Sequence, residues 1–397
     1  MTQLPRIWLS PPHMCGREQE FISNAFETNW IAPMGPNVTG FEQDLIDFTG
    51  VKHAVVLNSG TAAIHLSLIM LNIKAGDIVI CQSLTFSASA NPIIYQGATP
   101  LFIDSEPDTW NMDPELLENA IIACQEGDFH KLGNGSKHKH LKPQKPKAII
   151  VVHLYGMPAK MDEITKIAEK YDIPLIEDAA EALGSRYNGK ICGSFGKMGI
   201  LSFNGNKIVN TSGGGALISD EEEYTLKARF LATQARDNAP HYEHSQIGYN
   251  YRMSNVVAAI GRGQMTVIND RVEARRRNFE RYREYFTKVN KRGYEINLLD
   301  EPKGFFSNRW LTTITFEPEK NNNIDREKVR IYLETNNIES RPLWKPMHTQ
   351  PVFSDSLRIV NGVSEKLFDT GLCMPSGSNL NDEDFDRIFN TLDQIFI

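Results

Sequence analysis

The chain has 397 residues, and at about 150 residues per domain this length predicts two or three domains. Its 49 acidic residues outnumber its 42 basic ones, and the net charge of −7 provides no global attraction to nucleic acid or anionic lipid. Hydrophobic residues make up 41% of the chain and charged residues 23%, as in ordinary soluble enzymes and unlike disordered proteins.

The sequence shows no sign of export or membrane insertion. The longest apolar stretch, 148–152, is far shorter than the roughly 18 residues that a membrane span needs. The N-terminal residues lack a basic region followed by a long apolar core, so they do not look like a secretory signal. The five cysteines share no CxxC spacing, which favours reduced thiols over a zinc site or disulfides. We therefore expect a cytoplasmic enzyme without a metal, a membrane or nucleic acid as partner.

The first two thirds of the chain alternate between short β-branched runs and helical patterns. Residues 53–60 read as a strand entering a turn, and residues 61–73 read as a helix. Residues 161–172 also have helical spacing, and further apolar runs fall at 77–83, 99–105, 147–156 and 173–185. Such alternation predicts an α/β fold with a mostly parallel sheet covered by helices on both faces.

The last third changes character and predicts a smaller α+β domain. A charged helical stretch near 266–290 is followed by a strand-like run at 310–318 and a helix near 325–337. We accordingly expect a large domain over 1–260 and a small one over 261–397.

The segment 125–147 is polar, basic and poor in apolar residues, which predicts a mobile surface insertion. Its His138–His140 pair could bind a metal, but a solvated loop is the simpler interpretation.

The turn Asn58-Ser59-Gly60-Thr61 lies where a strand meets a helix. Free backbone amides and the helix dipole favour an anion there, and Gly60 permits a close approach to it. Plain capping of the helix by Thr61 explains the same residues, so the turn alone is a weak indication of a phosphate site.

Two acids, Glu177 and Asp178, end a strand of the predicted parallel sheet. The carboxyl ends of such strands are where open α/β sheets bind ligands. A buried carboxylate there needs a cation or several donors, so a structural salt bridge is the alternative.

Lys207 lies between a strand-like run and three consecutive glycines, Gly213–Gly215. A lysine amine with its pKa lowered by burial or by nearby cations is a nucleophile that can condense with an aldehyde. A solvated surface lysine is the alternative for Lys207 taken by itself.

Together the three segments supply what pyridoxal 5′-phosphate (PLP) requires. The turn at 58–61 would hold the phosphate, Asp178 would pair with the pyridine nitrogen, and Lys207 would hold the aldehyde. Phe86 could stack on the ring, and Ser202 could add a hydroxyl to the phosphate.

At this level of detail the chain resembles the DegT–StrS family of nucleotide-sugar aminotransferases. The resemblance rests on six motifs that occur in the expected order, namely NSGTAAIHL, LTFSASANPI, LIEDAAEALGS, SFNGNKIVNTSGGGA, GYNYRMSN and ESRPLWKPMH. It implies a fold-type-I PLP enzyme (PLP in one half-reaction, its amine form PMP in the other) that works as a homodimer with active sites at the subunit interface.

The pattern NWIAPMG with ESRPLWKPMH is most similar to enzymes that aminate C4 of a UDP-linked 4-keto-6-deoxy-N-acetylhexosamine, with L-glutamate as donor. Such enzymes belong to pathways for di-N-acetylated sugars such as bacillosamine, used in surface glycans or protein glycosylation. The resemblance also implies that the N-terminal segment 1–34 contributes to the substrate site.

Residue by residue, the resemblance assigns Lys207 and Asp178 to catalysis. It places the remaining cofactor contacts at Gly60, Thr61, Phe86, Glu181, Ser202, Asn204 and Asn250. Glu181 departs from the Gln or His that relatives often carry beside the ring, and Asn250 would reach the phosphate from the neighbouring subunit. Substrate contacts are expected at Trp30, Arg252, Arg341 and His348, with an interface salt bridge as the alternative for Arg252 and packing for the others.

Other functions remain to be weighed. A 3-amino-sugar transaminase acting on a TDP-linked ketosugar would share every cofactor motif. A non-catalytic PLP-fold regulator would usually carry a DNA-binding extension, which this sequence lacks. A family sugar dehydratase would carry histidine in place of Lys207, and a nicotinamide dehydrogenase would need a GxGxxG after a strand.

Overall fold

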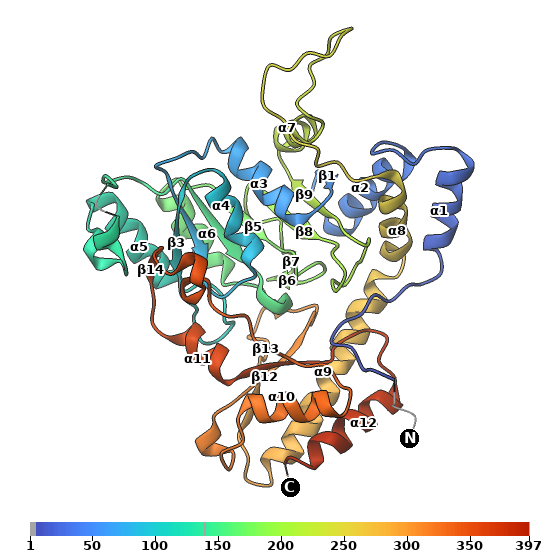
Figure 1. Ribbon diagram of the computed structural model, residues 1–397, viewed down its shortest axis with the longest axis vertical. Helices are drawn as coiled ribbons and strands as arrows, with labels where there is room; N and C mark the ends of the chain where they lie inside the picture. Colours follow the sequence, from blue (N-terminus) through green and yellow to red (C-terminus); the bar gives the residue numbers. More distant parts are fainter. Residues whose placement is uncertain (1–4, 139, 397) are drawn as a thin grey trace.

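The computed structural model describes residues 5–138 and 140–396. It has a large unit around a central sheet and a smaller unit below it, joined by the long helix α9 (Ile268–Asn290) (Figure 1). Residues 1–4 of the expected substrate segment and Lys139 of the predicted insertion lie outside the described residues.

The central sheet has eight strands in the order β1-β9-β8-β5-β4-β2-β3-β14. Seven of them run in one direction and β9 alone runs antiparallel to its neighbours, so the predicted mostly parallel sheet is confirmed. The strands are β1 (His53–Leu57), β2 (Ile78–Gln82), β3 (Thr99–Ile103), β4 (Ala148–Val152), β5 (Leu175–Asp178), β8 (Met198–Ser202), β9 (Gly215–Ser219) and β14 (Leu357–Ile359).

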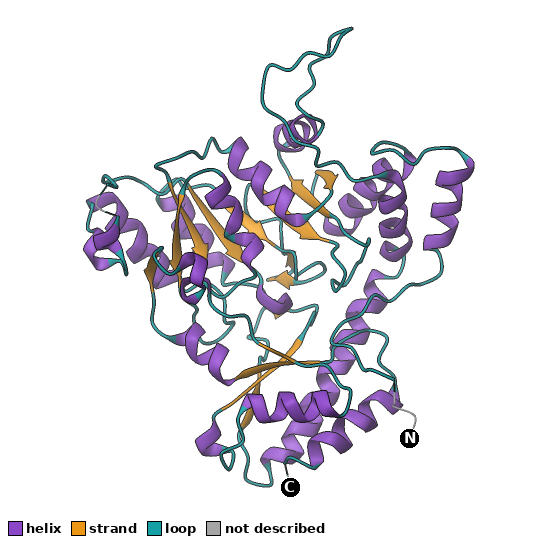
Figure 2. Cartoon of the chain, in the orientation of Figure 1, coloured by secondary structure: helices purple, strands orange, loops and turns teal. Residues whose placement is uncertain are grey.

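Both faces of this sheet are buried, which explains why its strands are apolar nearly throughout (Figure 2). Val55 and Leu57 pack on one face, while Ala54 and Val56, which alternate with them, pack on the other. The first face is covered by α3 (Gly60–Met70), α4 (Asn91–Tyr95) and α7 (Glu222–Ala232). The second is covered by α2 (Pro36–Thr49), α5 (Pro114–Glu126), α6 (Met161–Lys170) and α8 (Asn255–Met265), and α1 (Glu18–Glu27) lies against α8.

The smaller unit has its own core around a four-stranded antiparallel sheet in the order β10-β12-β15-β13. Its elements are α9, β10 (Ile296–Leu298), β12 (Thr312–Phe316), α10 (Arg326–Thr335), β13 (Arg341–Pro342), α11 (Val363–Thr370), β15 (Gly371–Met374) and α12 (Asp382–Asp393). A further small sheet contains β6 (Arg186–Tyr187), β7 (Lys190–Ile191) and β11 (Phe305–Phe306).

Two segments cross between the units. Strand β14, from the C-terminal third, adds to the edge of the central sheet beside β3. Near the N-terminus, Ile7 pairs with Ile338 of the small unit, and Arg6 forms an ion pair with Glu334. The division at residue 260/261 stays a prediction, and any boundary must allow for these two crossings.

The predicted insertion at 125–147 packs against the large unit. Phe129, Leu132 and Leu141 are buried in the same core as the apolar face of α5, and Gly133 pairs with Arg358 of β14. These three apolar anchors are too widely spaced to form a periodic pattern, which is why the composition alone suggested a free loop. Among the described residues, no group of three or more His, Cys, Asp or Glu side chains, including His138 and His140, could hold a metal.

Residues 5–138 and 140–396 include no helix with the length and apolar character needed to cross a bilayer.

Alternation along β5 separates its two terminal acids. Asp178 lies on the α3 face, whereas the fully buried Glu177 points to the opposite face. The Glu177 carboxylate accepts hydrogen bonds from the amides of Gly193, Phe195 and Gly196 and contacts His153 Nε2 at 3.0 Å. Glu177 therefore organises the turn that leads into β8.

Replacing Glu177 with alanine should leave the three turn amides, one buried and two half-buried, without an acceptor. We expect Glu177→Ala to lower the free energy of unfolding by about 3–5 kcal/mol, measured from denaturant midpoints. Glu177→Gln, which retains an acceptor oxygen, should lose less. Equal stability of the alanine variant and the wild type would contradict this structural role.

Candidate active site

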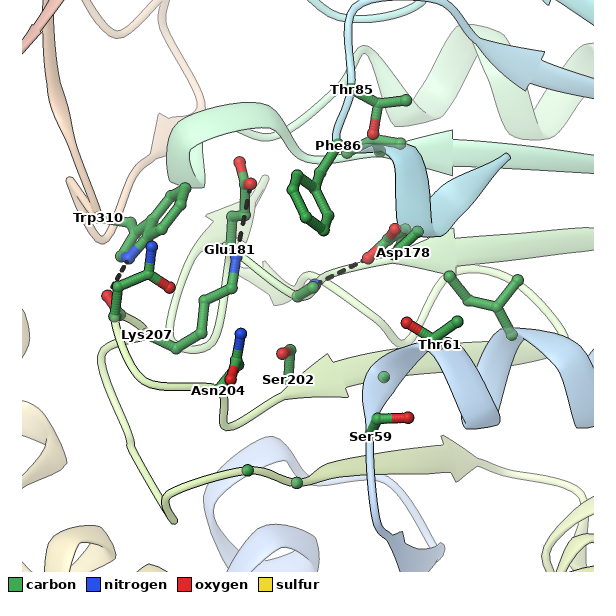
Figure 3. A pocket seen from close by; sticks show the side chains of 18 of the residues that line it. Ser59, Thr61, Thr85, Phe86, Asp178, Glu181, Ser202, Asn204, Lys207 and Trp310 are labelled. Atoms are coloured by element: carbon green, nitrogen blue, oxygen red, sulfur yellow. Dashed lines mark hydrogen bonds and ion pairs between the residues drawn. The ribbon is translucent and has the colours of Figure 1, made fainter. Parts of the chain in front are cut away.

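A cavity of about 280 Å³ opens at the carboxyl ends of β5 and β8, beside the start of α3 (Figure 3). This is the edge at which open α/β sheets bind ligands. Eight of the residues expected at a cofactor site line it together, namely Gly60, Thr61, Phe86, Asp178, Glu181, Ser202, Asn204 and Lys207.

The start of α3 forms one end of the cavity. Ser59, and not Thr61 as expected, caps the helix, because the Ser59 Oγ accepts from the Ala62 amide at 3.0 Å and the Ser59 carbonyl accepts from the Ala63 amide at 3.2 Å. The amides of Gly60 and Thr61 belong to the first turn, where a helix has no carbonyl acceptors for them. With the hydroxyls of Thr61 and Ser202 they provide donors for an anion at the positive end of the helix dipole.

Gly215 allows the sheet to approach this helix start closely. A Cβ at residue 215 would lie 2.3 Å from the Gly60 nitrogen and 2.4 Å from the Ser59 carbonyl carbon. Contact between β9 and the start of α3 therefore requires the last of the three glycines that follow Lys207, whereas a Cβ on Gly213 would meet nothing within 4 Å.

Asp178 at the end of β5 also lines the cavity and is buried, with 5% of its surface exposed. Its Oδ2 accepts from Ser89 Oγ at 2.6 Å and its Oδ1 accepts from the Ala180 amide at 3.1 Å. Thr85 in turn contacts Ser89 at 2.8 Å. Among the described residues no cation forms an ion pair with Asp178, so this oriented carboxylate remains able to pair with a protonated ring nitrogen.

Lys207 reaches into the cavity from the loop after β8. Its Nζ lies 3.9 Å from the centre of the Trp310 ring and 3.5 Å from Glu181 Oε1, and 12% of its side chain is exposed. Trp310 is itself fixed by a hydrogen bond from Nε1 to the Asn206 carbonyl at 2.8 Å. The alternative of a solvated surface lysine does not fit these contacts.

Glu181 is buried beside Lys207. Its Oε2 accepts from the Tyr155 amide at 2.7 Å, and Trp344 Nε1 lies 3.4 Å from Oε1. Burial raises the pKa of Glu181, although the charge of Lys207 and the Tyr155 amide act in the opposite direction.

Phe86 has 57% of its surface exposed and borders the cavity, with its ring centre 6.2 Å from that of Trp344. An apolar ring face open to the cavity suits stacking on a planar aromatic ligand.

Sequence reasoning did not single out several side chains that complete the cavity. Trp310 and Trp344 come from the C-terminal third, and Ser89 and Tyr155 act through hydrogen bonds behind the cavity wall. Trp344 lay within the quoted motif ESRPLWKPMH, whereas Trp310 only opened a run expected as a strand.

Five predicted residues do not line this cavity. Asn250 and Arg252 lie on the neighbouring segment, where the Asn250 carbonyl accepts from Asn58 Nδ2 and Arg252 donates to Thr233 Oγ1. Trp30 follows α1 and is 45% exposed.

Arg341 and His348 lie further along the C-terminal segment. Arg341 is exposed and pairs with Glu339 at 2.8 Å, in a groove that shares Trp344 with the cavity. His348 is buried, with Nδ1 2.6 Å from Ser83 Oγ and Nε2 2.9 Å from Glu365 Oε1. Both of its ring nitrogens are therefore engaged within the protein, which suits the packing interpretation.

The donor set fits PLP. An anion-binding helix start, a buried carboxylate without a cation partner, a lysine amine and an open aromatic face surround one cavity. These are the groups that a phosphate, a pyridine nitrogen, an aldehyde and an aromatic ring respectively require.

Comparison with known proteins agrees with this geometry. The model of the DegT/DnrJ/EryC1/StrS aminotransferase family matches residues 12–393. The chain belongs to this family. It is 49% identical to the putative pyridoxal phosphate-dependent aminotransferase EpsN of Bacillus subtilis, over 98% of this chain and 96% of that protein.

Other relatives carry names that specify a sugar. The chain is 34% identical to GDP-perosamine synthase of Caulobacter vibrioides over the whole of both chains. It is 37% identical to UDP-4-amino-4,6-dideoxy-N-acetyl-beta-L-altrosamine transaminase of Campylobacter jejuni, over 72% of this chain and 70% of that one. A solved structure of the putative sugar aminotransferase Spr1654 from Streptococcus pneumoniae, in its PLP form, matches with a TM-score of 0.85 at 26% identity, covering 98% of each chain.

The protein is thus a PLP-dependent sugar aminotransferase with the fold-type-I architecture. This result sets aside the dehydrogenase and the non-catalytic regulator.

We expect Gly215→Ala to weaken PLP binding about tenfold or more, because the added Cβ must push β9 away from the start of α3. Titration of cofactor-free protein with PLP, followed by absorbance, measures the dissociation constant. Gly205→Ala is the matched control, since the nearest atom to its Cβ is 3.9 Å away. Unchanged affinity in the Gly215 variant would exclude this part of the phosphate site.

Proposed function

We propose that this enzyme moves an amino group from L-glutamate to C4 of a UDP-linked 4-keto-6-deoxy-N-acetylhexosamine, giving a UDP-4-amino sugar and 2-oxoglutarate. Aminotransfer is supported most directly by the convergence of Lys207, Asp178 and the start of α3 on one cavity. The choice of sugar is supported by the resemblance in NWIAPMG and ESRPLWKPMH and by the name of the Campylobacter relative. A bacillosamine-type pathway for glycans or protein glycosylation is part of this proposal.

Bound PLP supplies an electron sink that allows the amino group to leave one carbon and join another. The buried carboxylate of Asp178 would keep the ring nitrogen protonated. Gly60, Thr61 and Ser202 would hold the phosphate, Phe86 would stack on the ring, and Asn204 would be a further cofactor contact.

Lys207 moves protons in both halves of the reaction. In the first half it takes the proton from the α-carbon of the amino acid, and in the second it delivers a proton to C4 of the sugar. One amine can serve both carbons because each substrate in turn brings its reacting atom to the same position, which supplies a large proximity effect. Trp310 and Trp344 help to exclude water from this position.

The working unit that we propose is a homodimer with shared sites. The segment between α7 and α8 extends far from the body of the subunit (Figure 1), and Tyr242 and Ile247 at 78% and 81% exposure suit burial against a second subunit. Asn250, at the base of this segment, would then reach the phosphate in the neighbouring subunit.

Arg252 suits an anionic ligand such as the nucleotide diphosphate. Its Nε is buried without a hydrogen-bond partner among the described residues. Burial and the nearby charge of Arg229 lower the pKa of Arg252. A bound anion would act in the opposite direction, because it stabilises the charged guanidinium. Trp30, Arg341 and His348 stay predictions as sugar contacts.

A GDP-linked ketosugar is the second candidate, because the match to GDP-perosamine synthase extends over both whole chains. The TDP-linked 3-ketosugar considered from the sequence is a third.

Mass spectrometry of the products formed from L-glutamate and UDP-4-keto, GDP-4-keto or TDP-3-keto sugars distinguishes the three candidate substrates. We expect kcat/KM for UDP-2-acetamido-4-keto-2,4,6-trideoxyglucose to exceed the others at least tenfold, which corresponds to about 1.4 kcal/mol of transition-state binding. Lys207→Ala is the control and should give no product. Preference for the GDP or TDP substrate would refute the proposed sugar while leaving aminotransfer intact.

A further inference from the structure

Two acids, Asp178 and Glu181, line the cavity. Asp178 would pair with the ring nitrogen of PLP, whereas Glu181 has no assigned role. Both the carboxyl and its neighbour Lys207 are nearly closed off from solvent, with 5% and 12% of their side chains exposed. The Tyr155 amide holds Oε2 at 2.7 Å, and this contact directs Oε1 toward Lys207 Nζ at 3.5 Å (Figure 3). The orientation of the carboxyl is thus set by the backbone and does not depend on the lysine.

No other described group near Lys207 is placed to receive its proton. Asp178 forms hydrogen bonds with Ser89 and Ala180 and no ion pair with Lys207. The Trp310 ring stabilises an ammonium group over its face but has no lone pair to offer. Glu181 is the sole ion-pair partner of Lys207 among the residues that the structure describes.

Burial brings the proton affinity of Glu181 closer to that of an amine. The groups that face it are Lys207, Asp178 at the end of β5, Tyr155, the Cys373 thiol of β15 and the Trp344 indole. Burial raises the pKa of Glu181, and Asp178 acts in the same direction, against Lys207, the Tyr155 amide and Trp344. In water a glutamate and a lysine differ by about 6 pKa units, which would prevent any useful exchange.

We propose that Glu181 is the proton-accepting partner of Lys207. The Lys207 ammonium must lose a proton before its amine can act as a nucleophile or base. In this step an N–H bond of the ammonium breaks and an O–H bond forms on Glu181 Oε1, so an ion pair becomes a neutral amine and a neutral acid. The proton stays within the cavity and returns when Lys207 is charged again. This role rests on aminotransferase chemistry alone and is independent of the sugar nucleotide.

The ionisation of Lys207 tests the pair directly in the full-length, cofactor-free protein. Trace labelling with acetic anhydride over a range of pH, with the Lys207 peptide quantified by mass spectrometry, reports the neutral fraction of its amine. In Glu181→Gln the stabilising carboxylate is lost while an oxygen remains for the Tyr155 amide. We expect labelling of Lys207 at neutral pH to rise about tenfold. The exposed Glu169→Gln on α6 is the matched control and should label like the wild type.

Infrared spectroscopy tests whether the Glu181 carboxyl can carry a proton. In Lys207→Met the buried carboxyl has no cation beside it, and we expect the carbonyl stretch of a protonated acid at neutral pH. The band should be missing from the wild type and from Lys207→Met/Glu181→Gln. Unchanged labelling in Glu181→Gln, or a Lys207→Met variant without the band, would overturn the proposal.

Discussion

The site depends on holding a lysine amine in a nearly dry cavity while keeping it reactive. Removing an ammonium group from water costs free energy, and the structure offsets that cost with the face of Trp310 at 3.9 Å and the Glu181 carboxyl at 3.5 Å. Neither contact is a short, ideal hydrogen bond that would fix the proton on the amine. The surroundings therefore stabilise the charged form without preventing its deprotonation.

The small unit helps to position the loop that carries Lys207, through the buried side chain of an arginine. Arg275 of α9 donates to the Trp310 carbonyl at 2.5 Å and to Ser10 Oγ at 3.0 Å, and Ser10 in turn donates to the Asn206 carbonyl, one residue before Lys207. Burial and the neighbouring charge of Arg271 lower the pKa of Arg275 to about 9. The N-terminal segment, α9 and the lysine loop are thus joined in one hydrogen-bonded network.

Site residues could be predicted from the sequence where the chemistry requires a particular residue type soon after a strand. Asp178, Gly60 and Lys207 could be found because each follows an apolar run and adopts its position locally. Trp310 and Ser89 could not, since they enter the site through packing between segments far apart in the chain. Alternation along β5 also explains why two adjacent acids, which looked alike in the sequence, have different tasks. The composition of the segment 125–147 did not reveal that three of its side chains, Phe129, Leu132 and Leu141, are buried in the core.

The covalent partner of PLP is the most direct test of the account. Protein saturated with PLP should be reduced with borohydride, digested and mapped by mass spectrometry, with Lys207→Ala treated in parallel. The account predicts a pyridoxyl phosphate group on the peptide that contains Lys207 and none in the variant. A label on a different lysine, or a wild-type protein that retains no label, would contradict it.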